Sequence, residues 1–308
     1  MSQLNKVDTD LLAVIAEMKD GKAPGAYNIR KDSGCADRVN TENVTITSKT
    51  DKPGIDVTFA PGCKESCHIP VIITESGLRE TVYNDFYVGE GADVLIIAGC
   101  GIHNCGEDAS EHDGVHTFYI GKNARVKYVE KHYGEGDGNG ERVMNPATVA
   151  HLEEGAVMQM DASQIGGIDS THRETSVICG KGAEVVITER LLTHGKQRAD
   201  SDMEIVLDGP DSRGRVISRS VAQDESVQQF RPRVVGNAKC FGHVQCDSII
   251  MGKAKISSVP EIAANDLDAQ LIHEAAIGRI AGDQLLKLQT LGLTSEEAED
   301  RILKGFLA

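Results

Sequence analysis

The sequence predicts a mainly β protein: a right-handed parallel β-helix with a short N-terminal helix and a C-terminal helical segment. Three observations carry this prediction: a recurring turn-and-strand pattern, a glycine-rich composition with few aromatics, and helical spacing confined to the two ends. The 308 residues suffice to bury a full core, and 40% hydrophobic with 26% charged residues is typical of a folded chain. The 32 glycines and 4% aromatics favour short strands joined by tight turns.

One pattern recurs through the chain: an apolar residue or cysteine, two or three turn residues, alanine, a variable residue and a further apolar residue. Its copies lie at residues 88–94, 120–126, 152–156, 179–185, 235–240 and 251–256. The alanines at 92, 124, 156 and 183 are separated by 32, 32 and 27 residues. Such a period is the signature of a solenoid, in which each coil buries its apolar side on the next. A jelly roll or stacked sandwich is the alternative, because the repeat degenerates after residue 200.

The N-terminal segment, residues 1–38, is expected to be helical or irregular. Its helix is predicted over residues 8–20, capped by Asp8 or Thr9 and closed by Gly21, with an apolar face at helical spacing. Such a helix usually covers a core; partner binding is the alternative. The β-helix core is predicted over residues 39–264, and its first strands at 44–47 and 55–59.

The C-terminal segment, residues 265–308, is expected to be helical. Leucines at 285, 288 and 291 lie on one face of a first predicted helix. Thr294 and Glu297 form a capping box for a second helix, which Gly305 is expected to end. The simplest role for this helical pair is to cover the open end of the solenoid.

Charge and composition exclude several classes of function. A net charge of −15 argues against nucleic acid and against an anionic membrane surface, since both need clustered Lys and Arg. No apolar run approaches the roughly 18 residues of a membrane span. The N-terminus lacks a basic region followed by an apolar core, so we expect a cytoplasmic protein. Its eight cysteines are then thiols or ligands rather than disulfides.

Several short motifs follow one another in the last seventy or so residues. They are Gln245-Cys246-Asp247-Ser248, His273-Glu274-Ala275, Gly278-Arg279-Ile280, Asp283-Gln284-Leu285, Gly292-Leu293-Thr294, Glu296-Glu297-Ala298 and Gly305-Phe306. In this order they resemble the C-terminal part of the SufB/SufD family of iron–sulfur cluster assembly scaffolds. The short chain, without a long N-terminal helical region, resembles the SufB-like proteins of archaea and anaerobes that accompany a SufC-like ATPase.

The resemblance implies a fold, a partner and a site. It favours the β-helix, the core of this family, and it implies that the C-terminal helical segment docks a SufC-type ABC ATPase. It places Cys246 at the cysteine that builds the cluster. It also places His273 and Glu274 at the His and His-Glu positions implicated in assembly. One chain with both features is expected to form a homodimer through the β-helix core.

The chemistry of these residues agrees with that role. Thiolate is the usual ligand of iron–sulfur clusters and also carries persulfide sulfur, while imidazole and carboxylate can hold iron. The competing interpretations are a buried structural cysteine at Cys246 and a helix cap at His273 and Glu274.

A second set of Cys and His residues lies mostly upstream. It consists of Cys63, Cys67, Cys100, His103, Cys105, His112 and His116, with Cys240 and His243 near the main motif. The spacing matches neither a C-x2-C zinc pattern nor a ferredoxin run. Three interpretations stay open: a metal or cluster site, structural histidines with buried thiols, or a redox thiol pair.

Other candidates carry weaker signals. His132, His151, His172 and His194 stand singly beside strands or turns, which indicates structural roles. The glycine-rich stretch 134–140 is acidic and precedes no helix pattern, so we interpret it as a mobile loop or a calcium site. The family's sulfur-entry cysteine has no clear counterpart; Cys179 is a candidate by elimination.

These observations predict a scaffold for de novo iron–sulfur cluster assembly rather than an enzyme. It would hold a transient 4Fe–4S or 2Fe–2S cluster, receive sulfur from a donor and pass the cluster to apo-protein acceptors. ATP hydrolysis must come from the partner, since the chain has no G-x-x-x-x-G-K-S/T loop. The alternatives are a Zn- or Fe-binding structural or storage module and, less favoured, a β-helix enzyme acting on polysaccharide.

Overall fold

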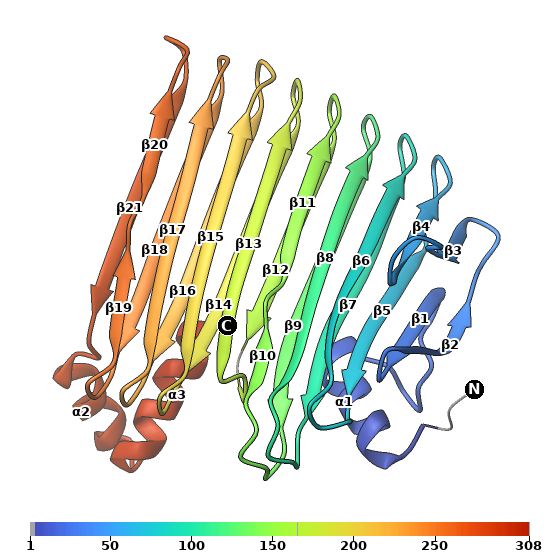
Figure 1. Ribbon diagram of the computed structural model, residues 1–308. Helices are drawn as coiled ribbons and strands as arrows, with labels where there is room; N and C mark the ends of the chain where they lie inside the picture. The colour runs from blue at the N-terminus through green and yellow to red at the C-terminus, as the bar shows by residue number, and fades with distance from the viewer. Residues whose placement is uncertain (1–3, 165, 308) are drawn as a thin grey trace.

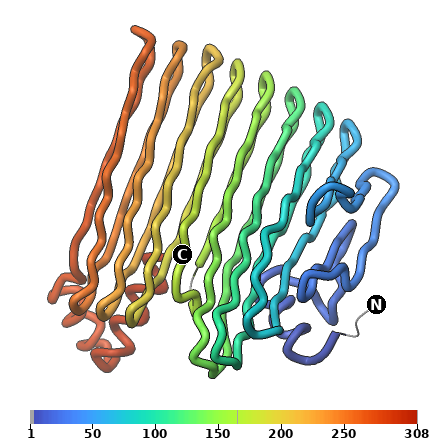
Figure 2. The backbone as a smooth tube through the Cα atoms, viewed as in Figure 1, coloured from blue at the N-terminus to red at the C-terminus, as the bar shows by residue number. Residues whose placement is uncertain are grey.

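A computed structural model describes residues 4–164 and 166–307, and it confirms the predicted mainly β solenoid. Figure 1 shows about eight turns stacked side by side from the blue N-terminal end to the red C-terminal end. The tube in Figure 2 shows how each turn runs up one sheet and returns down the other. Both sheets enclose one apolar core.

The described residues form two long sheets. The first sheet has the spatial order β2 (Gly34–Val39), β1 (Ala26–Lys31), β5 (Ser66–Ile73), β7 (Asp93–His103), β9 (Arg125–Glu135), β12 (Val157–Gln164), β14 (Glu184–Thr193), β16 (Arg213–Ala222), β18 (Phe241–Ile250), β21 (Gln270–Gly278). The second has the order β19 (Lys255–Ser258), β17 (Val227–Gly236), β15 (Arg198–Leu207), β13 (Ser170–Cys179), β10 (Arg142–Met144), β8 (Ser110–Ile120), β6 (Arg79–Val88), β4 (Gly54–Phe59), β3 (Val44–Ser48). In the second sheet β11 (Ala147–Leu152) also pairs with β8 and β13, and β20 (Glu261–Ala264) with β17.

Pairing is parallel and in register over most of the solenoid, so equivalent positions of successive turns stack. Inside, the rings of Phe86 and Phe118 stack with centroids 4.4 Å apart. Outside, Tyr87, Tyr119 and His151 form a ladder with centroids 5.2 and 5.5 Å apart. Stacking of like side chains is what a parallel ladder imposes.

The repeated alanines occupy tight corners of the solenoid, as the pattern predicts. Ala92, Ala124, Ala156 and Ala183 are buried, and each N–H donates to the carbonyl three residues earlier. The preceding residue has φ between 56° and 70° in all four corners. Glycine fills this left-handed position in three of them and Asn123 in the fourth, because few other residues adopt it without strain.

The N-terminal end of the solenoid is finished differently from the rest. Helix α1 spans Lys6–Ala16, shorter than the predicted 8–20, because Glu17 turns the backbone left-handed. Its cap is Asn5 rather than Asp8 or Thr9; Asp8 instead closes the capping box as the third helical residue. The helix packs on β5, β7 and β9, and the antiparallel hairpin β1–β2 lies within the segment predicted as helical or irregular.

At the C-terminal end the chain stays extended longer than the pattern suggests. Strand β21 adds a last rung to the first sheet before α2 (Gly282–Thr290) and α3 (Ser295–Leu307). The predicted capping box is confirmed: Glu297 N–H donates to the Thr294 hydroxyl, and Thr294 N–H to the Glu297 carboxylate. Gly305 does not end α3, so that prediction is wrong. Among the described residues no helix is long and apolar enough to cross a membrane.

Candidate functional site

Cys246 and His273 meet in the last rung of the solenoid. Cys246 lies on β18 and His273 on β21, and the Cys246 sulfur is 3.4 Å from His273 Nε2. Parallel pairing sets this contact: His273 is the register partner of Val244, whose side chain points inward like that of Cys246 two residues further on. Both groups therefore face the inside of the final turn.

Burial sets the protonation of this pair. Cys246 is 2% exposed, and desolvation raises the pKa of its thiol to about 11. Desolvation, with a smaller contribution from His243, lowers the pKa of His273. The pair near neutral pH is thus a thiol beside a neutral imidazole, whose nitrogen lone pair is available to a metal ion.

Glu274 and His243 lie on the other face of the first sheet. Neighbouring residues of a strand point to opposite sides, so Glu274 turns outward when His273 turns inward. Its carboxylate Oε2 is 3.5 Å from His243 Nε2, and the Glu274 side chain is 65% exposed. The structure therefore groups Cys246 with His273, and Glu274 with His243. His273 and Glu274 also sit within β21, which contradicts the alternative that they cap a helix.

The last rung forms an edge of the solenoid. The first sheet ends at β21, and Ile272 and Ile277 on this strand are each nearly half exposed. Val259, Ile262 and Leu267, on the neighbouring turns of chain, are exposed as well. An edge strand with unpaired backbone groups and apolar side chains is suited to pairing with another chain.

Cys100, His112 and His132 form a buried polar group near the middle of the solenoid. His112 Nδ1 lies 3.2 Å from Glu80 Oε1. Burial would raise the pKa of Cys100, but the positive charge of His112 and contact with His132 bring it down to about 7. Burial opposes protonation of His112, yet Cys100 and Glu80 raise its pKa to about 10. Cys100 and His112 thus favour a thiolate–imidazolium pair.

Next to this group runs a row of buried charges. Arg173 forms a charged hydrogen bond to Glu130, and its Nε is 3.5 Å from Glu189 Oε1. The Tyr128 hydroxyl donates to Glu130 at 3.1 Å, and His116 Nδ1 lies 2.7 Å from that hydroxyl. Burial opposes ionisation of Glu130, but Arg173 holds the pKa of its carboxyl well below the usual range.

The remaining candidates are dispersed. Cys63, Cys67, Cys179 and Cys240 lie in the apolar core, where burial raises the pKa of Cys67, Cys179 and Cys240. His103 and Cys105 lie at the rim, away from Cys100. Within the part of the chain that the structure describes, no three Cys, His, Asp or Glu side chains are arranged to hold a metal ion. The structure therefore distributes the upstream set over the buried group at Cys100 and His112, the apolar core and the rim.

Sequence reasoning missed the buried charges Glu80, Glu130, Arg173 and Glu189. A signal was present: Tyr128, Glu130 and His132 alternate in phase with Val126, which faces the core. A charged residue at an inward position of an alternating strand marks a buried polar network. Of the single histidines, His132 belongs to this network, His151 stacks on Tyr119, and His172 lies beside Asp202.

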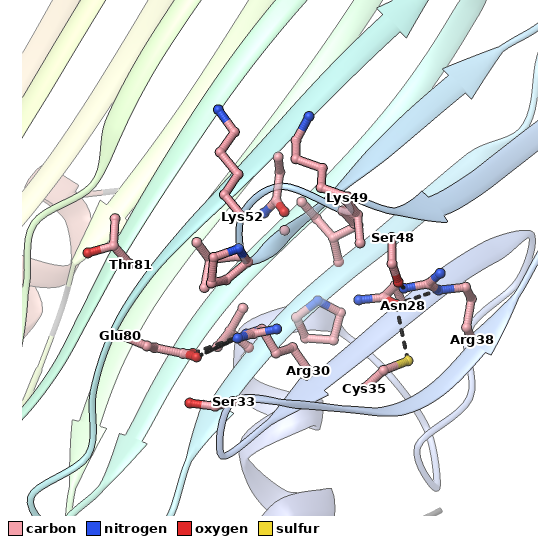
Figure 3. Close-up of a pocket in the computed structure, with 18 of the residues that line it drawn as sticks. Asn28, Arg30, Ser33, Cys35, Arg38, Ser48, Lys49, Lys52, Glu80 and Thr81 are labelled. Carbon is pink, nitrogen blue, oxygen red and sulfur yellow. Dashed lines mark hydrogen bonds and ion pairs between the residues drawn. The ribbon is translucent and has the colours of Figure 1, made fainter.

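Figure 3 shows a cavity of about 610 Å³ that is lined by residues of β1 to β6, and these strands lie at the opposite end of the solenoid from Cys246. Its cationic lining residues are Arg30, Arg38, Lys49, Lys52 and Arg79. Arg30 pairs with Glu80 at 2.7 Å. The exposed thiol of Cys35 lies 3.4 Å from the Asn28 side-chain oxygen. The cavity and the last rung are separate features.

Comparison with known proteins shows the family to which this chain belongs. The family described as "SUF system FeS cluster assembly, SufBD core domain" matches residues 76–306. An iron–sulfur cluster assembly SufBD family protein of Methanocaldococcus jannaschii is 27% identical over 300 residues, covering 94% of this chain and 92% of the relative. Proteins of the same description from Methanothermobacter thermautotrophicus and Archaeoglobus fulgidus are each 27% identical, covering 88% and 86% of this chain and 67% and 71% of their own lengths. Three quarters of the chain falls within the family match, and with the solenoid and its last-rung cysteine this establishes that the chain belongs to the SufB/SufD family of iron–sulfur cluster assembly proteins.

Proposed function

We propose that the protein is a scaffold on which an iron–sulfur cluster is built and from which it is transferred to acceptor proteins. The observation that carries this proposal is the Cys246–His273 pair, a thiol and an imidazole 3.4 Å apart. Iron and sulfide are the cargo here. His273 offers a neutral nitrogen to iron, and Cys246 supplies a thiolate once metal displaces its proton.

A dimer interface at the last rung would complete the site. Two side chains are too few to hold a cluster, which takes four ligands. Two copies that meet along β21 would bring together two Cys246–His273 pairs and cover the exposed Ile272 and Ile277. Burial of apolar side chains and pairing of edge backbone groups both favour this association.

The helices α2 and α3 are proposed as the docking element for a SufC-like ATPase. They pack on each other, and Ala298 is their one fully buried residue among those described. Leu286 and Leu291 are 60% and 76% exposed, so apolar surface remains for a partner. The Arg219 guanidinium donates to the Phe306 carbonyl at 3.4 Å and ties α3 to β16, two strands from the rung that carries His273. Movement of a bound ATPase would thereby reach the cluster site.

Anaerobic reconstitution with iron and sulfide tests the proposal. The wild type is compared with Cys246→Ser and His273→Ala by visible absorption and iron content. Glu274→Gln and Cys179→Ser are matched controls, since one alters the outward neighbour of His273 and the other a buried thiol in the middle of the solenoid.

We expect a chromophore in the wild type and both controls that is lost or becomes labile in Cys246→Ser and His273→Ala. A chromophore that survives both changes would place the cluster elsewhere. Tight binding of zinc with no chromophore in any variant would instead favour a metal-binding module.

A further inference from the structure

Cys105, His103 and Glu135 form a chain of contacts at the rim of the solenoid. The Cys105 sulfur lies 3.0 Å from His103 Nε2. The other ring nitrogen, Nδ1, lies 3.0 Å from Glu135 Oε1. A sulfur nucleophile, an imidazole and an orienting carboxylate in this sequence of contacts are the arrangement that activates cysteine and serine nucleophiles.

The parallel ladder creates this arrangement. His103 is the last residue of β7 and Glu135 the last of β9, and the two are register partners in neighbouring turns. Their side chains therefore leave the sheet on the same side, one turn apart. Cys105 follows two residues after the strand end, where the chain has left the sheet and can bend back toward the ring.

A backing of glycines holds the Cys105 loop in place. The side chain of Asn104, fully buried, donates to the Asp108 and Gly140 carbonyls and accepts from Gly106 N–H. A Cβ atom on Gly136 would lie 2.2 Å from the Asn104 carbonyl oxygen, and one on Gly138 2.3 Å from that of Gly106. The stretch 134–140 thus packs backbone against backbone beneath Cys105, and we assign it this supporting role.

The protonation pattern suits a base. Glu135 accepts a hydrogen bond from Nδ1–H, which leaves the lone pair of Nε2 to accept the Cys105 S–H. Asp137 also faces the thiol, and contact with Cys105 lowers the pKa of that carboxyl. Glu107, bonded to Asn139, adds a further negative charge at this rim.

Access distinguishes this thiol from those of the core. Cys105 is exposed, whereas Cys246 and Cys100 are buried. Cys35 is the other exposed thiol, and its side-chain partner is the Asn28 amide oxygen rather than a histidine. The acidic surroundings of Cys105 disfavour small anions, so a suitable reagent is neutral, cationic or carried by a protein.

We propose that Cys105 is a nucleophilic thiol that attacks a divalent sulfur electrophile, a disulfide or a persulfide, with His103 as its base and Glu135 as a positioning residue. With a disulfide R–S–S–R, a Cys105–S bond to one sulfur forms while the S–S bond breaks, giving a mixed disulfide and a thiolate. With a persulfide R–S–SH, attack on the outer sulfur gives Cys105–S–SH and R–S⁻. In both cases His103 takes the Cys105 proton and returns it to the departing thiolate, so electrons balance without another oxidant.

The test uses two full-length variants that differ in which exposed thiol remains. Cys35→Ser leaves Cys105, and Cys105→Ser leaves Cys35 as the matched control. Each is treated with hydroxyethyl disulfide or, separately, with hydroxyethyl persulfide, and the modified residue is followed over time by mass spectrometry of peptides. A mercaptoethanol adduct identifies disulfide exchange, and the gain of one sulfur atom identifies persulfide transfer.

We expect Cys105 to react at least about tenfold faster than Cys35 near neutral pH with one or both reagents. In the Cys35→Ser background, His103→Gln should abolish this advantage. Glu135→Gln should reduce it and change the dependence of rate on pH, since a neutral amide orients the ring without stabilising its charged form.

Equal rates for Cys105 and Cys35 with both reagents would overturn the proposal, and so would an unchanged rate in His103→Gln. Circular dichroism and melting temperature confirm that each variant is folded. The assay contains no iron, so its failure would leave the cluster proposal at Cys246 intact, and failure of cluster reconstitution would leave this inference intact.

Discussion

His116 Nδ1 lies 2.7 Å from the hydroxyl oxygen of Tyr128, inside the solenoid and away from water. The groups on either side of this contact fix which atom donates each hydrogen bond. The Asn84 amide N–H donates to Nε2 at 3.2 Å, Nδ1–H donates to Tyr128, and Tyr128 donates to Glu130. A neutral imidazole completes this network, and burial lowers the pKa of His116 to about 4.

The protein should lose stability in mild acid because of His116. The pKa of His116 is about 4 in the folded state and about 6.5 in the unfolded chain. Between about pH 6.5 and pH 4 the unfolded chain therefore binds a proton at His116 that the folded protein does not bind. The stabilisation is therefore complete above about pH 6.5 and is lost as the pH falls toward 4. The loss amounts to about 3 kcal/mol. Urea unfolding at a series of pH values measures it.

His116→Asn removes the titrating ring and serves as the comparison. We expect the unfolding free energy of this variant to be lower near neutral pH but to change less between pH values of about 6.5 and 4. An identical pH slope in both proteins would show that His116 is not the group responsible.

Arg173→Met should destabilise the fold by about 3–5 kcal/mol, because it leaves Glu130 buried without its counter-charge. Lys181→Met is the control: Lys181 pairs with Glu154 on the surface, where both side chains are about half exposed or more, and its loss should change the free energy of unfolding far less than Arg173→Met does. Chemical denaturation of both variants measures the difference. Similar losses of unfolding free energy in the two variants would mean that water reaches the Glu130 carboxylate inside the solenoid.

Ala124→Leu should cost about 1–3 kcal/mol, since the corner that encloses Ala124 has no room for a larger side chain. Lys122→Leu changes an exposed position of the same corner and should have little effect. Thermal melting distinguishes them. An unchanged melting temperature in both variants would contradict the explanation that alanine recurs at this corner for lack of space.

Ile277→Lys should weaken self-association by at least tenfold, because it places a charge on the proposed β21 interface. Val14→Lys alters a similarly exposed apolar residue on α1, at the other end of the chain, and should leave association unchanged. Sedimentation equilibrium over a range of concentrations gives both dissociation constants. If Val14→Lys disrupted association and Ile277→Lys did not, the interface would lie at the N-terminal end.

The sequence predicted the features that repeat. Alanine corners and positive-φ turns recur in several successive coils, so their period specified a solenoid. The capping box of Thr294 and Glu297 is a local signal that the structure confirms. Local signals failed where longer-range pairing decides. Residues 270–278 extend as β21 because β18 offers a free edge.

The site was predictable in part for the same reason. Cys246 and His273 were found through a motif, but their contact depends on the register of β18 and β21, and so does the outward orientation of Glu274. Glu135 is thirty-two residues from His103 and meets it through the ladder, whereas Cys105 reaches His103 through a local bend after β7. Spacing along the chain therefore grouped His103 and Cys105 with Cys100, whereas in the structure Cys100 is buried in the interior and Cys105 is exposed at the rim.

The two ends of the solenoid are unequal, and this difference bears on the proposed assembly through β21. At the N-terminal end, β2 and β3 pair antiparallel with β1 and β4, so the parallel ladder stops there in hairpins. At the other end β21 continues the ladder to its last strand. Two copies that join through β21, as proposed, use the same strand on both sides and so close into a twofold pair. A protein made of stacked β-strands can thereby use strand pairing for assembly without becoming a fibre.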